Sequence, residues 1–456
     1  MKIKRPVETG QVIVYEITGI AHNGVGVGKY QGFTVFTPYT VPGERIKAEI
    51  IQVKKNYAVA KMLDVENGHS QRVNPSCPIF KECGGCQLQH ISYETQLALK
   101  RQQVVDNLER IGGFKNVLVH PVLGMKEPWR YRNKVQVPIG IQNGRTVAGF
   151  YRAGSHEIIE MDQCLIQPEE SDQAVRLVKQ LADQLGITPY DEKKHQGILR
   201  HVMVRTGIHT QEMMIVLVTN GESLPNKKEF IQRLHNSFPQ MRSLIQNINT
   251  KRTNVILGEK NKLLWGEPVI YDHIGSVRYA ISPHSFFQIN PVQTEVLYEQ
   301  VRKYAALTGE EVIIDAYCGI GTIALYLAEG ASQVYGVEIV PEAIRDAKVN
   351  AEINGYTHVH FEVGAAEKVM PRWLEEGVYP DVVIVDPPRK GCQPELLDAI
   401  TGMKPKRLIY VSCNPATLAR DVKYLQEQGY YLQEVQPVDM FPQTMHVESV
   451  ALLTLR

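Results

Sequence analysis

Cys413 follows a run of apolar residues and stands directly before Asn414 and Pro415, near the end of the 456-residue chain. Because proline restricts the conformation of the residue before it, the pattern predicts a β-strand that ends at this cysteine. Ligands of open α/β sheets bind beyond the carboxyl ends of the strands, so the thiol would face a ligand. Cys413 is therefore a candidate nucleophile, and Asp386 to Arg389, Asp-Pro-Pro-Arg, would lie at the end of a nearby strand.

A glycine turn upstream predicts a ligand with a ribose. Residues 311–327 read as an apolar strand, a turn containing Gly319 and Gly321, and an apolar helix. A second strand ends at Glu338, about nineteen residues after Gly319, where a carboxylate can accept hydrogen bonds from both ribose hydroxyls. A Gly-x-Gly turn alone would also fit a dinucleotide. Together with Glu338 and Asp386 it indicates S-adenosylmethionine.

The residue after the Pro-Pro pair narrows the methyl acceptor. Enzymes of this fold that methylate amino groups usually place an aromatic ring there, whereas this chain has Arg389. Carbon 5 of uracil is a poor nucleophile, but a thiolate that adds to carbon 6 makes an enolate that can attack a methyl sulfonium. Cys413 would serve that purpose, and an amino-group acceptor would not need it.

Such a reaction also needs a general base to remove the proton from carbon 5 before the thiolate leaves. Glu448 is the candidate, and His446 is the rival because imidazole titrates nearer neutrality. Glu448 would need a raised pKa or a short reach. The alternative is that Glu448 is an exposed acid before a last strand, residues 450–455.

Three cysteines in residues 77–86 indicate a metal site. Cys77, Cys83 and Cys86 have Cys-x5-Cys-x2-Cys spacing, and Cys164 could complete a set of four. Four thiolates suit an iron-sulfur cubane or structural zinc, and spacing alone does not decide between them. The seven cysteines of this long chain do not resemble a disulfide scaffold.

The elements that would position these residues divide the chain into three parts. Residues 1–64 predict an OB-like, five-stranded β-barrel, with nine Lys or Arg against four Asp or Glu in residues 1–63, a balance that favours RNA. Residues 65–280 predict a central α+β domain, in which residues 129–134, Arg200 and Arg205 could contact RNA or be ordinary surface charge. Residues 281–456 predict a Rossmann-like class I methyltransferase domain.

The whole chain resembles the bacterial RNA uracil-5-methyltransferases. Residues 19–26 and 41–44 resemble the TRAM domain, and residues 285–290 resemble the family's Phe-x-Gln-x-Asn motif. The resemblance implies donor contacts for four residues and two catalytic roles. The donor residues are Gln288, Tyr317, Glu338 and Asp386, with Cys413 as nucleophile and Glu448 as general base. Thr322 departs from the pattern, because some relatives have an asparagine there that assists donor binding.

Within this family, the cysteines favour the members that act on large-subunit ribosomal RNA. Cys77, Cys83, Cys86 and Cys164 match their pattern, which implies a [4Fe-4S] cluster. The expected reaction is methylation of uracil C5 in 23S ribosomal RNA, at one or two uridines, through a covalent adduct of Cys413 with carbon 6. The alternatives are a transfer RNA methyltransferase, a radical S-adenosylmethionine RNA methylthiotransferase, and a non-catalytic ribosomal assembly factor.

The remaining expectations concern the setting of the enzyme. No apolar run approaches the 18 residues of a membrane span, so a cytoplasmic protein without a membrane partner is expected. The expected partner is a ribosomal RNA loop or assembly precursor, not DNA, because the target base must leave its stack to reach Cys413. A monomer is expected. Cys318 should pack beneath the glycine turn, and Cys392 should be exposed.

Overall fold

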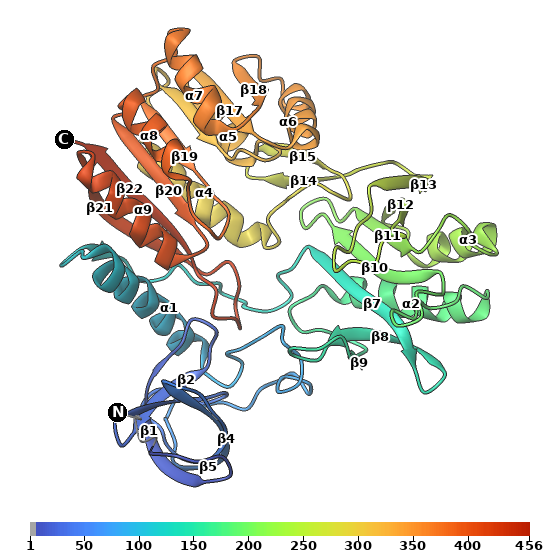
Figure 1. Cartoon of the computed structure of the whole chain (residues 1–456). Helices are drawn as coiled ribbons and strands as arrows, with labels where there is room; N and C mark the ends of the chain where they lie inside the picture. The colour runs from blue at the N-terminus through green and yellow to red at the C-terminus, as the bar shows by residue number, and fades with distance from the viewer. Residues whose placement is uncertain (1–5) are drawn as a thin grey trace.

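The computed structural model describes residues 6–456, which form a small barrel and two larger α/β parts (Figure 1). The barrel lies at the N-terminal end, the part with α2 and α3 lies on one side, and the part with the last strands lies on the other. No helix in residues 6–456 is both long enough and apolar enough to span a bilayer.

The N-terminal barrel is closed, with the strand order β1-β2-β3-β5-β4. Its strands are β1 (Val12–Ile20), β2 (Gly26–Tyr30), β3 (Phe33–Thr37), β4 (Arg45–Val53) and β5 (Tyr57–Asn67). Alternate side chains fill its interior, among them the fully buried Ile17, Val35 and Ile46. The predicted five-stranded barrel is confirmed. Of the nine Lys or Arg counted in residues 1–63, three lie outside the described residues: Lys2, Lys4 and Arg5.

The second part is a seven-stranded sheet with the order β13-β12-β11-β10-β7-β8-β9. Its strands are β7 (Lys134–Gln142), β8 (Arg145–Tyr151), β9 (Ile158–Glu160), β10 (Leu199–Thr206), β11 (Met213–Thr219), β12 (Met241–Ile248) and β13 (Lys260–Gly266). Helices α2 (Glu169–Gln184) and α3 (Lys227–Ser237) bury their apolar residues against one face of this sheet. The opposite face is left for contacts with the rest of the chain.

The third part is an eight-stranded sheet with the order β18-β17-β16-β19-β20-β22-β21-β6. Its strands are β6 (Leu118–Val119), β16 (Val312–Ala316), β17 (Gln333–Glu338), β18 (Val359–Val363), β19 (Val382–Val385), β20 (Arg407–Ser412), β21 (Tyr430–Val438) and β22 (Glu448–Leu455). The first five strands in this order are parallel to one another, and β22 is antiparallel to β20. The carboxyl ends of the parallel strands therefore meet at one edge.

Helices cover both faces of the third sheet. They are α4 (Pro291–Ala305), α5 (Thr322–Leu327), α6 (Pro341–Ile353), α7 (Ala366–Glu375), α8 (Pro394–Met403) and α9 (Pro415–Glu427), with a short 3-10 turn, η2 (Ala328–Gly330), after α5. Residues of α4 to α6 and of the hairpin β14 (Ile270–Ile274) and β15 (Val277–Ile281) share one apolar core. Residues of α7 to α9 belong to the core on the other face.

Helix α1 (Tyr93–Asn107) packs with this third part, although it lies far from it in the sequence (Figure 1). It continues into a π-helical turn, η1 (Leu108–Gly112), that contacts α9. Lys100 of α1 is fully buried, and its Nζ donates a hydrogen bond of 2.5 Å to Asp439 Oδ1. Tyr93 donates to the other carboxylate oxygen at 2.9 Å. This buried ion pair fixes the chain directly after β21.

Replacing Lys100 by methionine should destabilise the protein strongly. The substitution leaves the Asp439 carboxylate buried without its cation, and such broken pairs cost roughly 3–5 kcal/mol. Urea unfolding, followed by circular dichroism, should show the loss as a lower midpoint. The matched control is Lys251→Met, which breaks the exposed pair with Glu259 and should leave the midpoint unchanged. Equal midpoints for the Lys100 variant and the wild type would contradict the role of this ion pair.

Candidate functional site

Four of the predicted site residues lie at one edge of the third sheet. Tyr317, Glu338, Asp386 and Cys413 stand at or just after the carboxyl ends of β16, β17, β19 and β20. These four strands are parallel neighbours, so their ends adjoin. Glu448 reaches the same edge because β22 begins there and runs antiparallel to β20, with Ser449 opposite Ser412.

Cys413 occupies the sharp turn between β20 and α9. Asn414 caps α9, since its side chain accepts a hydrogen bond from the Ala416 amide, and its Nδ2 donates to the Arg389 carbonyl at 2.9 Å. Pro415 takes the first helical position. The thiol is partly exposed, and burial, followed by the charges of Glu448 and Asp386, raises its pKa to about 11. A nearby positive charge is therefore needed to favour the thiolate.

Glu448 is buried, with 5% of its surface exposed, which overturns the alternative of an exposed acid. It is the first residue of β22 and not a residue before the last strand. Burial, and then the charge of Asp386, raises its pKa to about 8. Burial likewise raises the pKa of Asp386 to about 7. Raised carboxylate pKa values near neutrality are typical of groups that transfer protons.

The rival His446 differs from Glu448 in its surroundings. Its side chain is exposed, and its ring packs edge-on against Phe441, with 5.9 Å between the ring centroids. Partial desolvation of the ring by neighbouring atoms, and then the charge of Arg389, lower its pKa although the side chain reaches solvent.

The glycine turn after β16 brings the backbone close to the sheet edge. The backbone of Tyr317 has a φ of 66°, in the left-handed region that residues other than glycine rarely adopt, and Gly321 has a φ of 82°. A Cβ on Gly321 would lie 2.6 Å from the ring of Phe361, so glycine is required there. Glu338 accepts a hydrogen bond from the Val340 amide through Oε1. Its other carboxylate oxygen makes no hydrogen bond within residues 6–456.

Gln288 lies in the segment before α4, and the second part of the chain holds that segment. Asn133 donates from Nδ2 to the Gln288 carbonyl at 2.9 Å and from its amide to the Ile289 carbonyl at 2.8 Å. Arg205 of β10 is buried and donates to the Ser285 carbonyl at 2.6 Å. Arg205 therefore fits neither of the two expectations, an RNA contact or ordinary surface charge, because its buried guanidinium positions this segment.

Because Gln288 is expected to contact the donor, replacing Arg205 by methionine should weaken donor binding. Methionine keeps much of the volume but leaves the Ser285 and Pro283 carbonyls without their charged donor, a loss that corresponds to roughly tenfold in an equilibrium constant. The KM for S-adenosylmethionine should rise by about that factor while kcat falls less. The control Arg233→Met removes a partly exposed arginine of α3 and should change neither constant. An unchanged KM in a folded Arg205 variant would refute the positioning role.

The four predicted cysteine ligands line one cavity of about 290 Å³. Cys77, Cys83 and Cys86 come from the segment before α1, and Cys164 comes from the loop before α2. Burial is the main reason that the pKa of Cys86 is raised to about 11 and that of Cys164 to about 12. The negative charges of neighbouring cysteines of the set contribute to both increases. Within residues 6–456, no three His, Cys, Asp or Glu side chains converge on a point that would hold a single metal ion.

Several functional features were not predicted from the sequence. Asp315, at the end of β16, is 1% exposed, accepts from the Ala324 amide at 3.0 Å and has a pKa raised well above its ordinary value by burial and by Asp386. Its place before the glycine turn could have indicated it. Asn290 caps α4 and donates to the Met440 carbonyl. Thr322, the departure noted above, accepts a hydrogen bond from Tyr298.

Cys392 is buried in the core beside α8 and α9, not exposed as expected, and its amide donates to Asp421 of α9. Cys318 is buried beside Gly336, as expected. In segment 129–134 two side chains serve packing, since Arg130 donates to the Cys164 and Gln167 carbonyls and Tyr131 donates to the Pro442 carbonyl. These hydrogen bonds connect the cysteine loop to the catalytic edge.

Comparison with known proteins gives the family. The profile described as tRNA (uracil-5-)-methyltransferase matches residues 160–456, and the TRAM domain profile matches residues 6–63. An uncharacterized RNA methyltransferase of Halalkalibacterium halodurans is 56% identical, covering 100% of this chain and 99% of its own length. One of Clostridium tetani is 50% identical, covering 100% and 98%.

A solved structure extends the likeness to the whole fold. The Pyrococcus abyssi tRNA (uracil-54, C5)-methyltransferase, solved in complex with S-adenosyl-L-homocysteine, is 32% identical with a TM-score of 0.79. The match covers 97% of this chain and 100% of the other. This chain therefore belongs to the tRNA (uracil-5-)-methyltransferase family of S-adenosylmethionine-dependent RNA methyltransferases, and it carries an N-terminal TRAM domain.

Proposed function

We propose that the protein methylates carbon 5 of uracil in 23S ribosomal RNA, with Cys413 as the nucleophile and Glu448 as the general base. The observation that carries this proposal is the placement of Asp386, Cys413 and Glu448 on neighbouring strands at the carboxyl edge of the sheet. A thiol alone would fit many reactions. A thiol beside a buried carboxylate with a pKa near 8 fits one that needs covalent addition and then removal of a proton.

In this mechanism Cys413 adds as a thiolate to carbon 6 of the extruded uracil, and carbon 5 gains nucleophilic character. Arg389, whose charge lowers the pKa of Cys413, favours the thiolate. The donor supplies an electrophilic methyl group to carbon 5 and leaves as the neutral thioether. Glu448 then takes the proton from carbon 5, and the electron pair of that bond forms the 5,6 double bond as the Cys413 thiolate leaves.

The donor would be held by Gln288, Tyr317, Glu338 and Asp386. Glu338 suits the ribose, since one of its carboxylate oxygens remains free at the end of β17. Gln288 is supported by the segment that Asn133 and Arg205 hold in place. Asp386 lies between the donor edge and the nucleophile, and its raised pKa would let it share a proton with the uracil edge.

We also propose that Cys77, Cys83, Cys86 and Cys164 hold a [4Fe-4S] cluster. The cysteines fit this group because all four line a single cavity and come from two segments that enclose it. A cubane binds one thiolate at each of its four irons, so its ligands surround a volume and do not converge on one atom. When bound, the cluster would fasten the cysteine loop to the loop before α2. Residues 1–64, 65–280 and 281–456 would then act as RNA-binding, cluster-bearing and catalytic units.

Replacing Cys164 by serine should remove the cluster without removing the nucleophile. Anaerobically purified wild-type protein should contain about four iron and four sulfide per chain and absorb visible light, whereas Cys164→Ser should lose most of both. The matched control is Cys413→Ala, which should keep the iron and lose methylation. Stoichiometric zinc and no sulfide in the wild type would contradict the proposed cluster.

The ribosomal substrate rests on the cysteine set, because the resemblance associates such clusters with large-subunit RNA enzymes. The decisive assay incubates the protein with tritiated S-adenosylmethionine and unmodified transcripts of 23S ribosomal RNA or transfer RNA, followed by nucleoside analysis. We expect label in 5-methyluridine from the 23S transcript. Label only from transfer RNA would keep the chemistry and overturn the substrate, and label in another nucleoside would overturn the reaction.

A further inference from the structure

A second large cavity lies in the seven-stranded sheet, away from Cys413. It measures about 800 Å³ and is bordered by the ends of β7 and β8 and by the loops before β9, β10 and β13. Its volume falls within the range of pockets that bind small molecules or nucleotides. None of the residues that line it has a role in the reaction proposed above.

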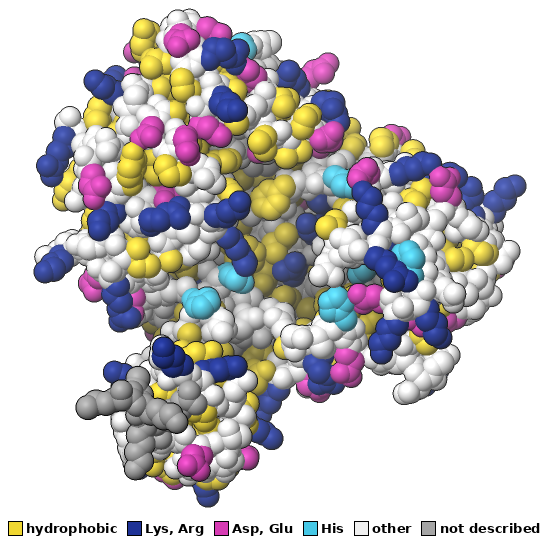
Figure 2. Space-filling model, viewed as in Figure 1, with side chains coloured by type: hydrophobic (Ala, Val, Ile, Leu, Met, Phe, Trp, Pro, Cys, Tyr) yellow, Lys and Arg dark blue, Asp and Glu magenta, His cyan; other side chains and the backbone are white. Residues whose placement is uncertain are grey.

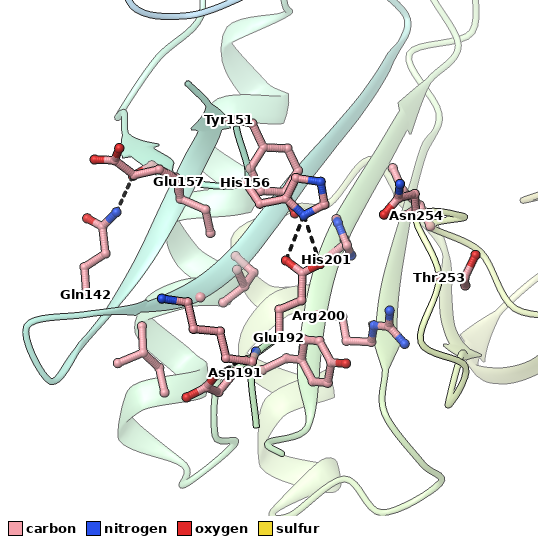
Figure 3. A pocket seen from close by; sticks show the side chains of 17 residues that line it. Gln142, Tyr151, His156, Glu157, Asp191, Glu192, Arg200, His201, Thr253 and Asn254 are labelled. Atoms are coloured by element: carbon pink, nitrogen blue, oxygen red, sulfur yellow. Dashed lines mark hydrogen bonds and ion pairs between the residues drawn. The ribbon is translucent and has the colours of Figure 1, made fainter. Parts of the chain in front are cut away.

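Flat side chains face this cavity from two sides (Figure 3). Tyr151 and His156 stack with their ring centroids 5.3 Å apart and an interplanar angle of 27°. His156 is held by Glu192, whose carboxylate lies 2.9 Å from its Nδ1. Across the cavity, the guanidinium of Arg200 lies 4.6 Å above the ring of Tyr190. Aromatic rings and guanidinium planes are the surfaces on which proteins stack unpaired bases.

The cavity also contains polar groups without partners. Arg200 is 5% exposed, and while its Nη1 donates to the Asn249 and Lys251 carbonyls, its Nε has no partner. The Nδ1 of His201 is buried without a hydrogen bond, and its Nε2 forms none within residues 6–456. Burial lowers the pKa of His201 to about 4, so the ring is neutral and has one donor and one acceptor nitrogen.

The charges in the cavity favour a base over a polyanion. Glu157, Asp191 and Glu192 oppose Lys193 and Arg200, so the lining has no positive excess that would concentrate phosphates. A nucleobase is a neutral ring with hydrogen-bond donors and acceptors on its edge. It therefore suits both the flat side chains that line the cavity and the unpaired imidazole of His201. The phosphates of a bound strand would remain outside, in solvent.

The position of the cavity connects it to the catalytic part. His201 and Arg205 are four residues apart on β10 and therefore point to the same face of the sheet. Arg205 holds the segment that carries Gln288, so that face is the one directed toward the catalytic part. Figure 2 shows that the three parts of the chain surround a hollow whose margins carry Lys, Arg and His side chains.

We propose that this cavity binds an unpaired nucleotide of the RNA substrate, other than the target uridine, by stacking its base among Tyr151, His156 and Tyr190. The inference rests on the RNA methyltransferase family of the chain and not on the ribosomal assignment. Binding one base here while another enters the catalytic edge would hold the strand at two points. That arrangement would select RNA in which both of these nucleotides are unpaired.

The test measures binding of a fluorescein-labelled oligouridine of about 20 nucleotides to the full chain by fluorescence anisotropy, with S-adenosylhomocysteine present. Tyr151→Leu and His156→Ala should each weaken binding about 5- to 50-fold, since each removes part of a stacking surface. The matched control is Tyr379→Leu, an aromatic residue that is 68% exposed before β19, and it should bind as the wild type does. Thermal unfolding identifies any variant that fails to fold.

A crosslinking arm keeps the proposal falsifiable if a variant is unstable. The wild type is irradiated with the same oligouridine carrying 4-thiouridine, and the attached peptides are identified by mass spectrometry. Attachment within residues 139–158 or 188–201 supports the proposal. Attachment confined to other segments, together with unchanged affinity of folded variants, overturns it. Saturable binding of free UMP that leaves oligouridine affinity unchanged also overturns it, in favour of a small-molecule site. Failure of the 23S assay leaves these readouts unaffected.

Discussion

Cys413→Ala is expected to abolish methyl transfer to RNA, with kcat reduced by at least about 10⁴-fold, because carbon 5 of uracil is not nucleophilic without thiolate addition at carbon 6. The assay is single-turnover transfer of a tritiated methyl group to the RNA that the wild type methylates. The substitution removes a small, partly exposed side chain in a turn fixed by Asn414, so the fold should be unaffected.

A trapping experiment distinguishes covalent catalysis from a structural effect. RNA that contains 5-fluorouridine has no proton at carbon 5 for a base to remove, so methyl transfer should leave the protein attached to the RNA. The wild type should give a complex stable in denaturing gels, and Cys413→Ala should give none. Methyl transfer by Cys413→Ala at the rate of the wild type would refute the covalent mechanism. The control Cys318→Ala removes a thiol beneath the glycine turn and should still form the complex.

Glu448→Gln is expected to slow turnover by about 10²- to 10⁴-fold, the usual contribution of a general base. The loss has a specific form, because glutamine cannot accept the proton but leaves the earlier steps intact. The variant should therefore transfer one methyl group and accumulate the covalent protein–RNA complex with ordinary RNA. If Glu448→Gln turned over as fast as the wild type while His446→Ala lost about 10²- to 10⁴-fold in turnover, the general base would be His446.

The pH dependence of the wild type should report the same group. Glu448 is an effective base only when ionised, and its pKa of about 8 lies well above the ordinary value of a glutamate. The rate of the elimination step should therefore rise with pH through about 8 and level off above it. The Cys413 thiol, with a pKa raised to about 11, adds a further rise at higher pH in the addition step. A rate that is flat from pH 6 to pH 9 would contradict both assignments.

Two residues of the catalytic edge could be located from local sequence signals, whereas Tyr317 came only from the family resemblance. Cys413 precedes Asn-Pro, and Glu338 ends an apolar strand, so strand ends could be located without tertiary information. The structure confirms that these ends adjoin. Their assignment to the donor and the nucleophile remains a proposal, as does the cluster. The family resemblance, in contrast, is confirmed by matches across the whole chain.

The long-range contacts could not be read from local patterns. The glycines of β2 weaken the strand pattern in the sequence, yet glycine is needed there, because a Cβ on Gly28 would lie 2.8 Å from the ring of Tyr15. Arg205 looks like a surface arginine in sequence, yet its partners lie about 80 residues away. The ion pair of Lys100 and Asp439 joins residues 339 positions apart, and neither local segment indicates it.

That separation has a consequence for how the protein is made. At the usual speed of translation, about 5–20 residues per second, Lys100 is incorporated roughly 20 to 70 s before Asp439. During this interval the Lys100 ammonium has no counterion, and the side of α1 that packs against β21 and α9 stays exposed. The docking site of α1 is therefore complete only when the last segment of the chain has been synthesised. A catalytic fragment expressed without α1 would have the converse defect, because the Asp439 carboxylate would lack its cation.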